Sequence, residues 1–309
     1  DHLVAERVWQ ELARGLMEAR PSRMFTVLRD CGALARLLPE LDRLWGVPQR
    51  ADYHPEVDTG VHVMMVLDMA ARLGASLPVR YACLGHDLGK GTTPADILPR
   101  HLGHEGRSVR LLRDVSERLR VPNDCRELAD VVAREHGNVH RSGEFGPEAV
   151  LRLLERCDGL RKPARFREVL LACECDARGR LGLDDCPYPQ GERLARALDT
   201  VLAVDTASVS AEALARGGNA ETFAIAVAGW MRYALGTGPD GNRYDLRDPR
   251  SGEIAEMMEQ DIVAIAPDLP AQAIGLADIG AEGAVVRRQG PMGRGDEAGR
   301  KDPTPVEEA

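Results

Sequence analysis

The sequence predicts an all-α protein. Only 4% of its 309 residues are aromatic, whereas Ala, Leu, Arg and Glu dominate, and this composition favours helices over strands. Apolar residues recur with the 3.6-residue period of a helix in one segment after another, and no long stretch alternates with the period of two that is typical of strands. Proline and glycine separate these segments at ordinary loop lengths. We therefore expect a multi-helix architecture.

The first two thirds of the chain divide into helices at these residues. VWQELARGLM and SRMFTVLRDCGALARLLPEL carry the helical period, which predicts short helices over residues 5–45. A connector follows over residues 48–55. Helical segments then succeed one another over residues 57–204, with expected boundaries at Pro78, Gly89, Gly91, Pro122, Gly137, Pro147 and Pro163.

The last third of the chain has a different composition. An apolar segment over residues 221–236 and a second over 251–264 predict one more pair of helices. From about residue 280 the chain is rich in glycine, proline and charge, and we expect a disordered tail. The segment 220–255 weakly resembles the C-terminal domain of the long-chain mannitol and fructuronate dehydrogenases. No G-x-G-x-x-G accompanies it, so a nicotinamide site is not implied.

Composition also limits the function classes. No run of about 18 uncharged apolar residues predicts a membrane span, and no secretory signal is recognisable. The seven cysteines have no paired spacing, which favours a cytoplasmic protein. A net charge of −9 argues against a surface coated with nucleic-acid-binding basic residues, although a local patch is compatible with it. Because Asp1 is not a natural first residue, we expect a fragment or a processed product.

Histidines and carboxylates carry the strongest chemical signal. Seven of the eight histidines lie between His54 and His140, and His86 stands beside Asp87 in CLGHDLGKG, where a helix ends. Such residues are costly to bury unless something pairs with them. Four candidates nevertheless lie three, four or seven residues from apolar positions on their helices: His62, His86, His136 and Asp158. Four helices would therefore direct ligands into one interior.

Imidazole and carboxylate ligands together suit Mn²⁺, Fe²⁺, Co²⁺, Ni²⁺ or Zn²⁺, and Mg²⁺ where carboxylates dominate. A single histidine on an apolar face is more often a hydrogen-bonded core residue, and we assign that role to His54 and His101. His140 could turn either way. A bound metal would activate water and polarise a phosphoryl oxygen. Lys90, between two glycines after Asp87, could hold the phosphate; alternatively it is a solvated lysine at a helix end.

These residues carry a family resemblance. The series His62, His86-Asp87, His104, His136 and Asp158 resembles the H…HD…H…H…D pattern of the HD superfamily, which are all-helical metal-dependent phosphohydrolases. YHPEVDTGVHVMMVL, LGHDLGKGTTP, RLRVPNDCRELADVVAREH and DGLRKPARFREVLLACECDARGR further resemble the body and HD domain of the bacterial multifunctional CCA-adding family, which are tRNA nucleotidyltransferases. The resemblance extends over residues 5–216.

The resemblance implies a site and an activity. The first metal would be held by His62, His86, Asp87 and Asp158. His104 and His136 would hold a second metal or the phosphate, Lys90 would hold the phosphate, and the catalytic set would be His86, Asp87 and Lys90. The cofactor would be a divalent metal such as Ni²⁺, Mn²⁺, Mg²⁺ or Co²⁺. The implied activities are those of a 2′,3′-cyclic phosphodiesterase, 2′-nucleotidase and phosphatase.

The family's nucleotidyltransferase head has no counterpart in this sequence. The chain contains no D-x-D carboxylate pair, and its one Gly-Gly, at 217–218, is far from any predicted strand, so we expect no nucleotide addition by this chain alone. The helices before His54 and the patch from Arg161 to Arg180 are where the family's tRNA-facing body would map, although a solvated helix face would also explain the patch. We expect five segments: a helical neck (1–50), the HD domain (51–165), a helical body segment (166–217), an extra helical segment (218–280) and the tail (281–309).

The sequence thus predicts a metal-dependent phosphohydrolase that acts in the processing and repair of tRNA 3′ ends. Its partners would be a tRNA 3′ end or a nucleotide phosphate, with no membrane, and an oligomer is compatible with the sequence. The alternative is a catalytically idle tRNA-binding helical body that needs a separate nucleotidyltransferase head domain.

Overall fold

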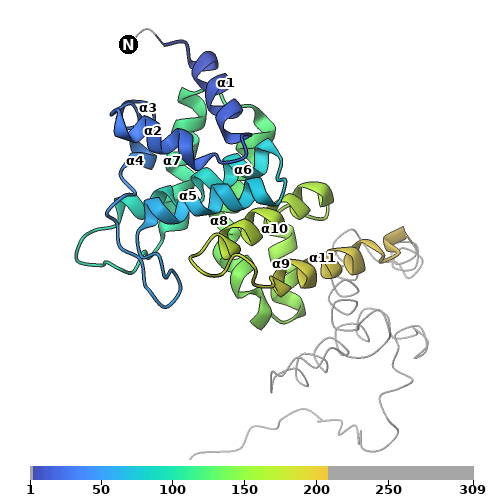
Figure 1. Ribbon diagram of the computed structural model, residues 1–309. Coiled ribbons are helices and arrows are strands. Elements are labelled where there is room, and N and C mark those ends of the chain that lie inside the picture. Colours follow the sequence, from blue (N-terminus) through green and yellow to red (C-terminus); the bar gives the residue numbers. More distant parts are fainter. Residues whose placement is uncertain (1–2, 208–309) are drawn as a thin grey trace, which may run out of the picture. The chain divides into compact units, whose positions relative to one another are not determined.

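The computed structural model describes residues 3–207, in which all regular secondary structure is helical (Figure 1). The elements are α1 (Ala5–Leu16), α2 (Ser22–Asp30), α3 (Leu34–Leu37), α4 (Pro39–Asp42), α5 (Thr59–Arg72), α6 (Leu77–Gly85), the 3-10 helix η1 (Leu88–Thr92), α7 (His104–Arg118), α8 (Asn123–Arg141), the 3-10 helix η2 (Ser142–Glu144), α9 (Pro147–Arg156), α10 (Pro163–Arg178) and α11 (Pro189–Leu202). The predicted all-α fold is confirmed. The segments predicted beyond residue 207 lie outside the described residues.

Proline and one aspartate fix where the helices begin. Proline stands in the first turn of α4, α6, α9, α10 and α11, where it removes an N–H that has no partner in the helix. Asp58 caps α5: its carboxylate accepts a hydrogen bond from the backbone N–H of Val61 at 3.0 Å and a second from Gly46 at 2.6 Å. The connector 48–55 is thereby held against the start of α5, with an isolated β-bridge between Pro48 and Asp58.

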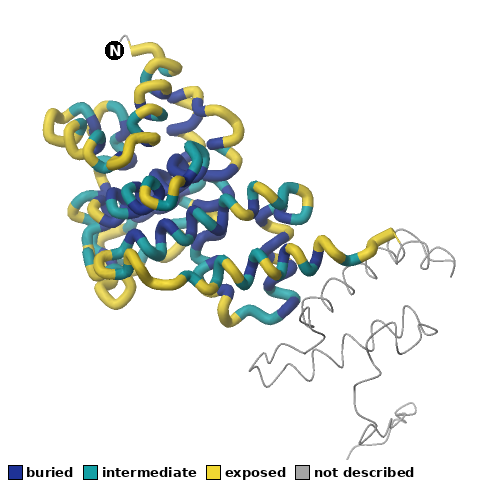
Figure 2. The backbone as a smooth tube through the Cα atoms, turned by 45° about the vertical axis from the view of Figure 1, so that its right-hand side comes forward, coloured by how far each residue is buried: buried dark blue, intermediate teal, exposed yellow. Residues whose placement is uncertain are grey.

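Helices α5, α6, α8 and α10 form the centre of the described part. α6 packs against α5 and α8, and α10 packs against all three. Every residue of α6 from Val79 to Gly85 is buried, including the charged Arg80. Buried residues concentrate on these central helices, whereas the loops and the ends of the outer helices are exposed (Figure 2). None of the helices within residues 3–207 is long and apolar enough to cross a membrane.

The N-terminal helices are attached to this centre through the end of α1. Its apolar face buries Trp9, whose ring packs edge-on against Tyr81 with centroids 5.3 Å apart. The guanidinium of Arg80 donates hydrogen bonds to the carbonyl oxygens of Leu16 at 2.8 Å and Glu18 at 2.9 Å. Carbonyls at a helix C-terminus have no partner inside the helix, so this buried arginine satisfies groups of α1 and joins them to α6.

Two glycines allow the elements that carry polar residues to approach closely. At Gly89 in η1, a Cβ would lie 2.6 Å from the backbone nitrogen of Ser108 and closer still to the carbonyl oxygen of His104. At Gly179, just after α10, it would lie 2.6 Å from the Cα of Val66 in α5. Only a residue without a side chain fits at such distances. The glycines therefore set η1 against α7 and α10 against α5.

Candidate metal centre

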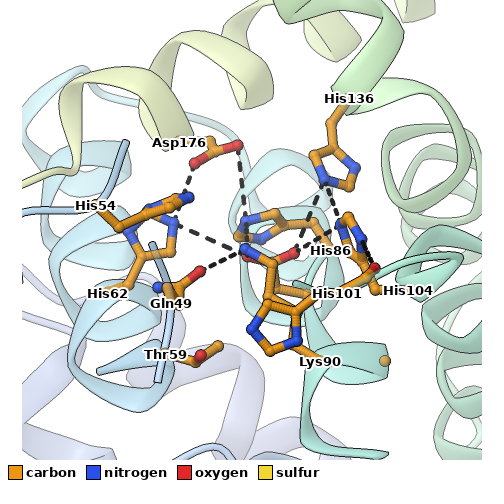
Figure 3. Close-up of polar contacts among 12 residues, drawn as sticks. Gln49, His54, Thr59, His62, His86, Lys90, His101, His104, His136 and Asp176 are labelled. Atoms are coloured by element: carbon orange, nitrogen blue, oxygen red, sulfur yellow. Dashed lines mark hydrogen bonds and ion pairs between the residues drawn. The ribbon is translucent and has the colours of Figure 1, made fainter. Parts of the chain in front are cut away.

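Six buried or partly buried polar residues from five different elements meet in the interior. His62 comes from α5, His86 and Asp87 from the link between α6 and η1, and the others begin α7 (His104) or lie in α8 (His136) and α10 (Asp176). Figure 3 shows the imidazole rings and the carboxylate of Asp176 turned towards one another. His62 is 0% exposed and Asp87 1% exposed, so water does not solvate these groups.

The ligand atoms of these six residues fall into two groups, and His62 also belongs to a third group with His54 and Glu56. One consists of His62, His86 and Asp176, and the other of Asp87, His104 and His136; within each group the ligand atoms lie within 4.8 Å of one another. In the first group, Nε2 of His62 is 3.0 Å from Oδ1 of Asp176, and Nε2 of His86 is 3.8 Å from Oδ2 of the same carboxylate.

Asp87 lies between the two groups. Its Oδ2 is 3.2 Å from Nε2 of His86 and 4.0 Å from Nε2 of His62, which places it against the first group. Its Oδ1 is 3.3 Å from Nε2 of His104 and 3.8 Å from Nε2 of His136. One carboxylate can therefore serve both groups, which is the arrangement that a pair of neighbouring cations would need.

The backbone fixes the orientation of three of these rings. Nδ1 of His86 is 2.8 Å from the carbonyl oxygen of Cys83, Nδ1 of His104 is 2.9 Å from that of His101, and Nδ1 of His136 is 3.0 Å from that of Val132. A carbonyl oxygen only accepts, so each Nδ1 carries the proton and donates. In the neutral rings Nε2 then presents a lone pair to the centre, as a metal ligand must.

Several of these atoms have no hydrogen-bond partner among the described residues. Nε2 of His86 and Oδ1 of Asp87 are both buried and unpaired, and such atoms are costly to leave without a partner. The Nε2 atoms of His104 and His136 lie 3.3 Å apart, so two lone pairs face each other where both rings are neutral. Positive charge between these groups would satisfy all four atoms. The residues thus fit a divalent cation, and their mixed nitrogen and oxygen donors suit a transition metal.

The electrostatics of the cluster agree with this fit. Burial alone would raise the pKa of Asp87, but Lys90 and His86 outweigh it and hold that pKa well below its usual range. Burial opposes ionisation of Asp176 as well, yet His140 and His86 keep its pKa low. Burial also opposes the charged form of His86, whose pKa is nonetheless raised to about 9 by Asp87 and Asp176. Both carboxylates are therefore charged, and they attract a cation.

His136 behaves differently from His86. Burial outweighs the opposing charge of Asp87 and lowers its pKa to about 3, so the ring is neutral at physiological pH. A neutral imidazole with Nδ1 bonded to a backbone carbonyl is the form that binds metals.

Lys90 is buried rather than solvated at a helix end. Its side-chain nitrogen lies 2.7 Å from Oδ2 of Asp87 and donates to Oε1 of Gln49 at 2.5 Å, and the residue is 6% exposed. Gln49 comes from the connector 48–55, and Nε2 of its amide has no partner among the described residues. His101 has the structural role expected of it, since its ring bonds Thr93 at 2.8 Å and the carbonyl of Pro48 at 3.1 Å.

The prediction that Asp158 joins the histidines is wrong. Helix α9 ends at Arg156, so the helical spacing from Leu151 and Leu154 does not extend to Asp158, whose φ is 55°. Its carboxylate instead pairs with Arg161 at 2.9 Å and Arg165 at 3.2 Å.

Sequence reasoning missed Asp176, which takes the place expected for Asp158. A signal was present: Asp176 follows the buried Ala172 and Cys173 by four and three residues, so it lies on the apolar face of α10. It also missed Glu56, in the connector before α5. One carboxylate oxygen of Glu56 is 2.9 Å from Nδ1 of His62 and 3.1 Å from Nδ1 of His54. Glu56 thus supports His62 from the side opposite Asp176, a frequent arrangement around metal-binding histidines.

A cavity of 910 Å³ opens beside the cluster. Lys90, His104 and His140 line it on the side of the cluster, together with Tyr53 and Tyr188. The remaining charged residues of its lining are mainly basic: Arg50, Arg100, Arg141, Arg178 and Arg180, against Glu105 as the one carboxylate. An anionic ligand is therefore favoured in this cavity.

The patch from Arg161 to Arg180 is different, because its basic residues are paired with carboxylates. The pairs are Arg161 with Asp158 (2.9 Å), Lys162 with Glu127 (2.6 Å), Arg165 with Glu127 (2.9 Å), Arg167 with Asp199 (2.5 Å), Arg178 with Glu174 (2.7 Å) and Arg180 with Asp176 (3.6 Å). Their charges are largely neutralised, so this patch is a weaker anion site than the part of the cavity that Arg100 and Arg141 line.

Comparisons with known proteins match this geometry. The sequence profile of the HD domain matches residues 59–180, and the profile described as the probable RNA and SrmB-binding site of polymerase A matches residues 1–44. Asp176 lies within the HD match. The chain is 73% identical over 234 residues to the multifunctional CCA protein of Paracidovorax citrulli, an alignment that covers 76% of this chain and 55% of the relative.

Two other relatives have similar identities and coverages. The multifunctional CCA proteins of Polaromonas naphthalenivorans and Cupriavidus metallidurans are 71% and 72% identical over 217 and 210 residues. These alignments cover 70% and 68% of this chain and 51% of each relative. The chain thus spans about half the length of the curated relatives it matches.

Proposed function

Because this chain is homologous to the multifunctional CCA proteins and its residues 59–180 form an HD domain, we propose that it is a metal-dependent phosphohydrolase. Its substrates are 2′,3′-cyclic or 2′-phosphorylated nucleotides at tRNA 3′ ends, and its compartment is the cytoplasm. The observation that carries the proposal is the buried cluster itself, in which imidazole nitrogens and carboxylate oxygens converge and in which Nε2 of His86 and Oδ1 of Asp87 have no hydrogen-bond partner among the described residues.

In this proposal a first cation would be held by His62, His86, Asp87 and Asp176, with Asp176 in place of Asp158. His104 and His136, together with Asp87, would hold a second cation or a phosphate oxygen. The choice among Ni²⁺, Mn²⁺, Mg²⁺ and Co²⁺ depends on the ratio of nitrogen to oxygen ligands. That ratio here favours a transition metal over Mg²⁺.

A divalent cation bound there would activate a water molecule and polarise a phosphoryl oxygen. The chain's own residues would bind the phosphate and exclude bulk water. Lys90, held over Asp87 by Gln49, places a compact positive charge where a phosphate oxygen would approach. Burial of the cluster excludes bulk water and strengthens each of these electrostatic interactions.

Two features support a nucleotide as the substrate. The basic residues around the cavity favour phosphate groups, and the rings of Tyr53 and Tyr188 offer surfaces for a base. The match of residues 1–44 to an RNA-binding profile, and the names of the relatives, support tRNA as the molecule that carries the reacting end. We further propose that residues 1–50 act as a helical neck and that the HD domain, expected to end at residue 165, continues to residue 180 and so includes Asp176.

The test combines metal content with activity. Purified wild-type protein should contain or take up a stoichiometric divalent transition metal and hydrolyse 2′,3′-cyclic nucleotides. Asp87→Ala should lose both properties, because its carboxylate contacts both groups of ligands. A correctly folded wild-type protein that binds no divalent cation, or Asp87→Ala that hydrolyses at the wild-type rate, would refute the proposal.

The second candidate is an idle tRNA-binding body that needs a separate head domain. The sequence contains no D-x-D pair, so no nucleotide addition is expected from this chain, and this expectation fits both candidates. The two candidates differ in metal binding, which the idle body does not require.

A further inference from the structure

His140 has a hydrogen-bond pattern opposite to that of His86, His104 and His136. Its Nε2 lies 2.7 Å from Oδ2 of Asp176, and its Nδ1 lies 2.9 Å from the hydroxyl of Tyr188. His86, His104 and His136 instead have Nδ1 on a backbone carbonyl and Nε2 towards the centre. His140 therefore requires a separate explanation.

The partners of His140 determine which nitrogen carries the proton. The charged carboxylate of Asp176 can only accept, so Nε2 of His140 donates to it. In a neutral ring Nδ1 then has only a lone pair, and the hydroxyl of Tyr188 donates to that nitrogen. Nε2 of His140 thus holds a hydrogen and does not act as a metal ligand. Nε2 of His62 differs, because the Glu56 carboxylate lies 2.9 Å from Nδ1 of that ring and can accept its hydrogen there. The chain Tyr188, His140, Asp176 runs from the cavity lining to a proposed ligand.

The segment that carries Tyr188 is anchored to the end of α8, where His140 lies. Nε2 of Gln190 donates to the carbonyl oxygen of His140 at 3.3 Å. The guanidinium of Arg193 donates to the carbonyl oxygens of Ser142 and Phe145, the latter at 2.6 Å. Three residues around the start of α11 thus hold this segment on the end of α8 and on η2 with the residue that follows it. They all lie beyond the HD match, which ends at residue 180.

We propose that Tyr188 and His140 are positioning residues: they fix the carboxylate of Asp176 and thereby set the affinity of the centre for a divalent cation. Asp176 has two oxygens, and His62 contacts Oδ1 while His140 contacts Oδ2. With the hydroxyl of Tyr188 in place, His140 keeps its proton on Nε2 and the carboxylate keeps one orientation. This inference rests on the proposed metal-dependent function, and it adds a residue from outside the HD match to the site.

The test measures the affinity of the purified full chain for Mn²⁺ by titration calorimetry. Tyr188→Phe removes only the hydroxyl, and affinity should fall about tenfold to 100-fold, as for other residues that support metal ligands. The matched control is Tyr53→Phe, because Tyr53 lines the same cavity but its ring packs on Arg50 instead of bonding a histidine. An affinity of Tyr188→Phe equal to that of Tyr53→Phe would overturn the inference.

A double mutant tests the route through His140. The side chain of His140→Gln can donate an N–H to Asp176 without help from a tyrosine. Adding Tyr188→Phe to His140→Gln should therefore change the affinity less than twofold, whereas independent effects would multiply and contradict the inference.

A spectroscopic readout separates failure of this inference from failure of the proposed function. Nitrogen-15 NMR of the histidine rings should find His140 with its proton on Nε2 in the wild type and a mixture of tautomers in Tyr188→Phe. A wild-type protein that binds no Mn²⁺ would refute the proposed function. The position of the proton on the His140 ring would then still test the contact between His140 and Tyr188. A wild-type His140 with its proton on Nδ1 would overturn the inference even if the metal binds.

Discussion

Two aspartates with similar sequence contexts have opposite roles in this structure. Asp158 and Asp176 both follow apolar helical residues at spacings of three, four or seven. Asp176 stays inside α10 and reaches the histidines, whereas Asp158 lies two residues beyond the end of α9 and faces two arginines. The difference depends on where the helix ends, and no proline or glycine precedes Asp158 to mark that end.

The pair provides an internally controlled prediction. Asp176→Asn should reduce phosphohydrolase activity at least ~10³-fold, about 4 kcal/mol of barrier, because the centre loses a charge that holds the cation. Asp158→Asn should retain activity within twofold, since that residue pairs with Arg161 and Arg165 and contacts none of the proposed ligands. The measurement is kcat/KM for a 2′,3′-cyclic nucleotide with added Mn²⁺. The opposite result, an inactive Asp158→Asn beside an active Asp176→Asn, would restore Asp158 as a ligand.

Much of the rest of the site follows from residue spacing. Predicted ligands His62, His86, Asp87, His104 and His136 are brought together, because each is placed by a helix or by the residue that ends or begins one. The supporting contacts did not follow from spacing. Glu56, Gln49 and Tyr188 lie in connectors, where the path of the backbone depends on tertiary contacts that no local periodicity records.

At the scale of elements, the prolines predicted helix starts well because they act locally. The same residues say nothing of how closely two elements pack, and that distance decides whether ligands meet. η1 and α7 approach so closely that Gly89 has no room for a Cβ, and this approach sets Asp87 3.3 Å from His104. A glycine in the sequence predicted a boundary here, but its role in packing became evident only from the structure.

Gly89→Ala should therefore separate η1 from α7. The added methyl would meet backbone atoms of His104 and Ser108, which cannot rotate away, and we expect a loss of about 1–3 kcal/mol of stability. Metal affinity should fall as well, because Asp87 and His104 move apart. Gly143→Ala is the control, since no atom lies within 4 Å of its Cβ position. Urea unfolding of the metal-free proteins would measure the effect, and equal midpoints for the two variants would disprove it.

For the whole molecule, the net charge is negative, whereas the charge around the cavity is mainly positive. The chain carries −9, yet the cavity beside the cluster is lined by basic residues with one carboxylate. Arg50 pairs with Asp52 and Arg178 with Glu174. Arg141 contacts the neutral side chain of Asn138, and the side chain of Arg100 makes no ion pair within residues 3–207. Among the arginines of the cavity lining, these two have no carboxylate partner within residues 3–207, whereas Arg180 lies 3.6 Å from Asp176.

This distribution predicts how the protein would distinguish the end of an RNA strand from a mononucleotide. A 2′,3′-cyclic mononucleotide has only the reacting phosphate, so Arg100→Glu and Arg141→Glu should hydrolyse it within twofold of the wild-type rate. An oligoribonucleotide with the same terminal group also has upstream phosphates, and its kcat/KM should fall at least about tenfold in each variant because an attractive charge becomes repulsive. Arg196→Glu, exposed on α11 and away from the cavity, is the control.

Salt dependence supplies the second measurement, because each phosphate contact to a single strand releases bound counterions. The logarithm of the affinity for the oligoribonucleotide should decrease linearly with the logarithm of the salt concentration. In each of the two variants this decrease should be less steep, with a slope smaller in magnitude by about 0.7. Binding to the metal-free protein is enough for this experiment, so it does not depend on catalysis. Equal slopes in the wild type, Arg100→Glu and Arg141→Glu would mean that upstream phosphates do not enter the cavity. In that case its positive charge would act only on the reacting group, through Lys90 and Arg180, which lie nearest the carboxylates of the centre.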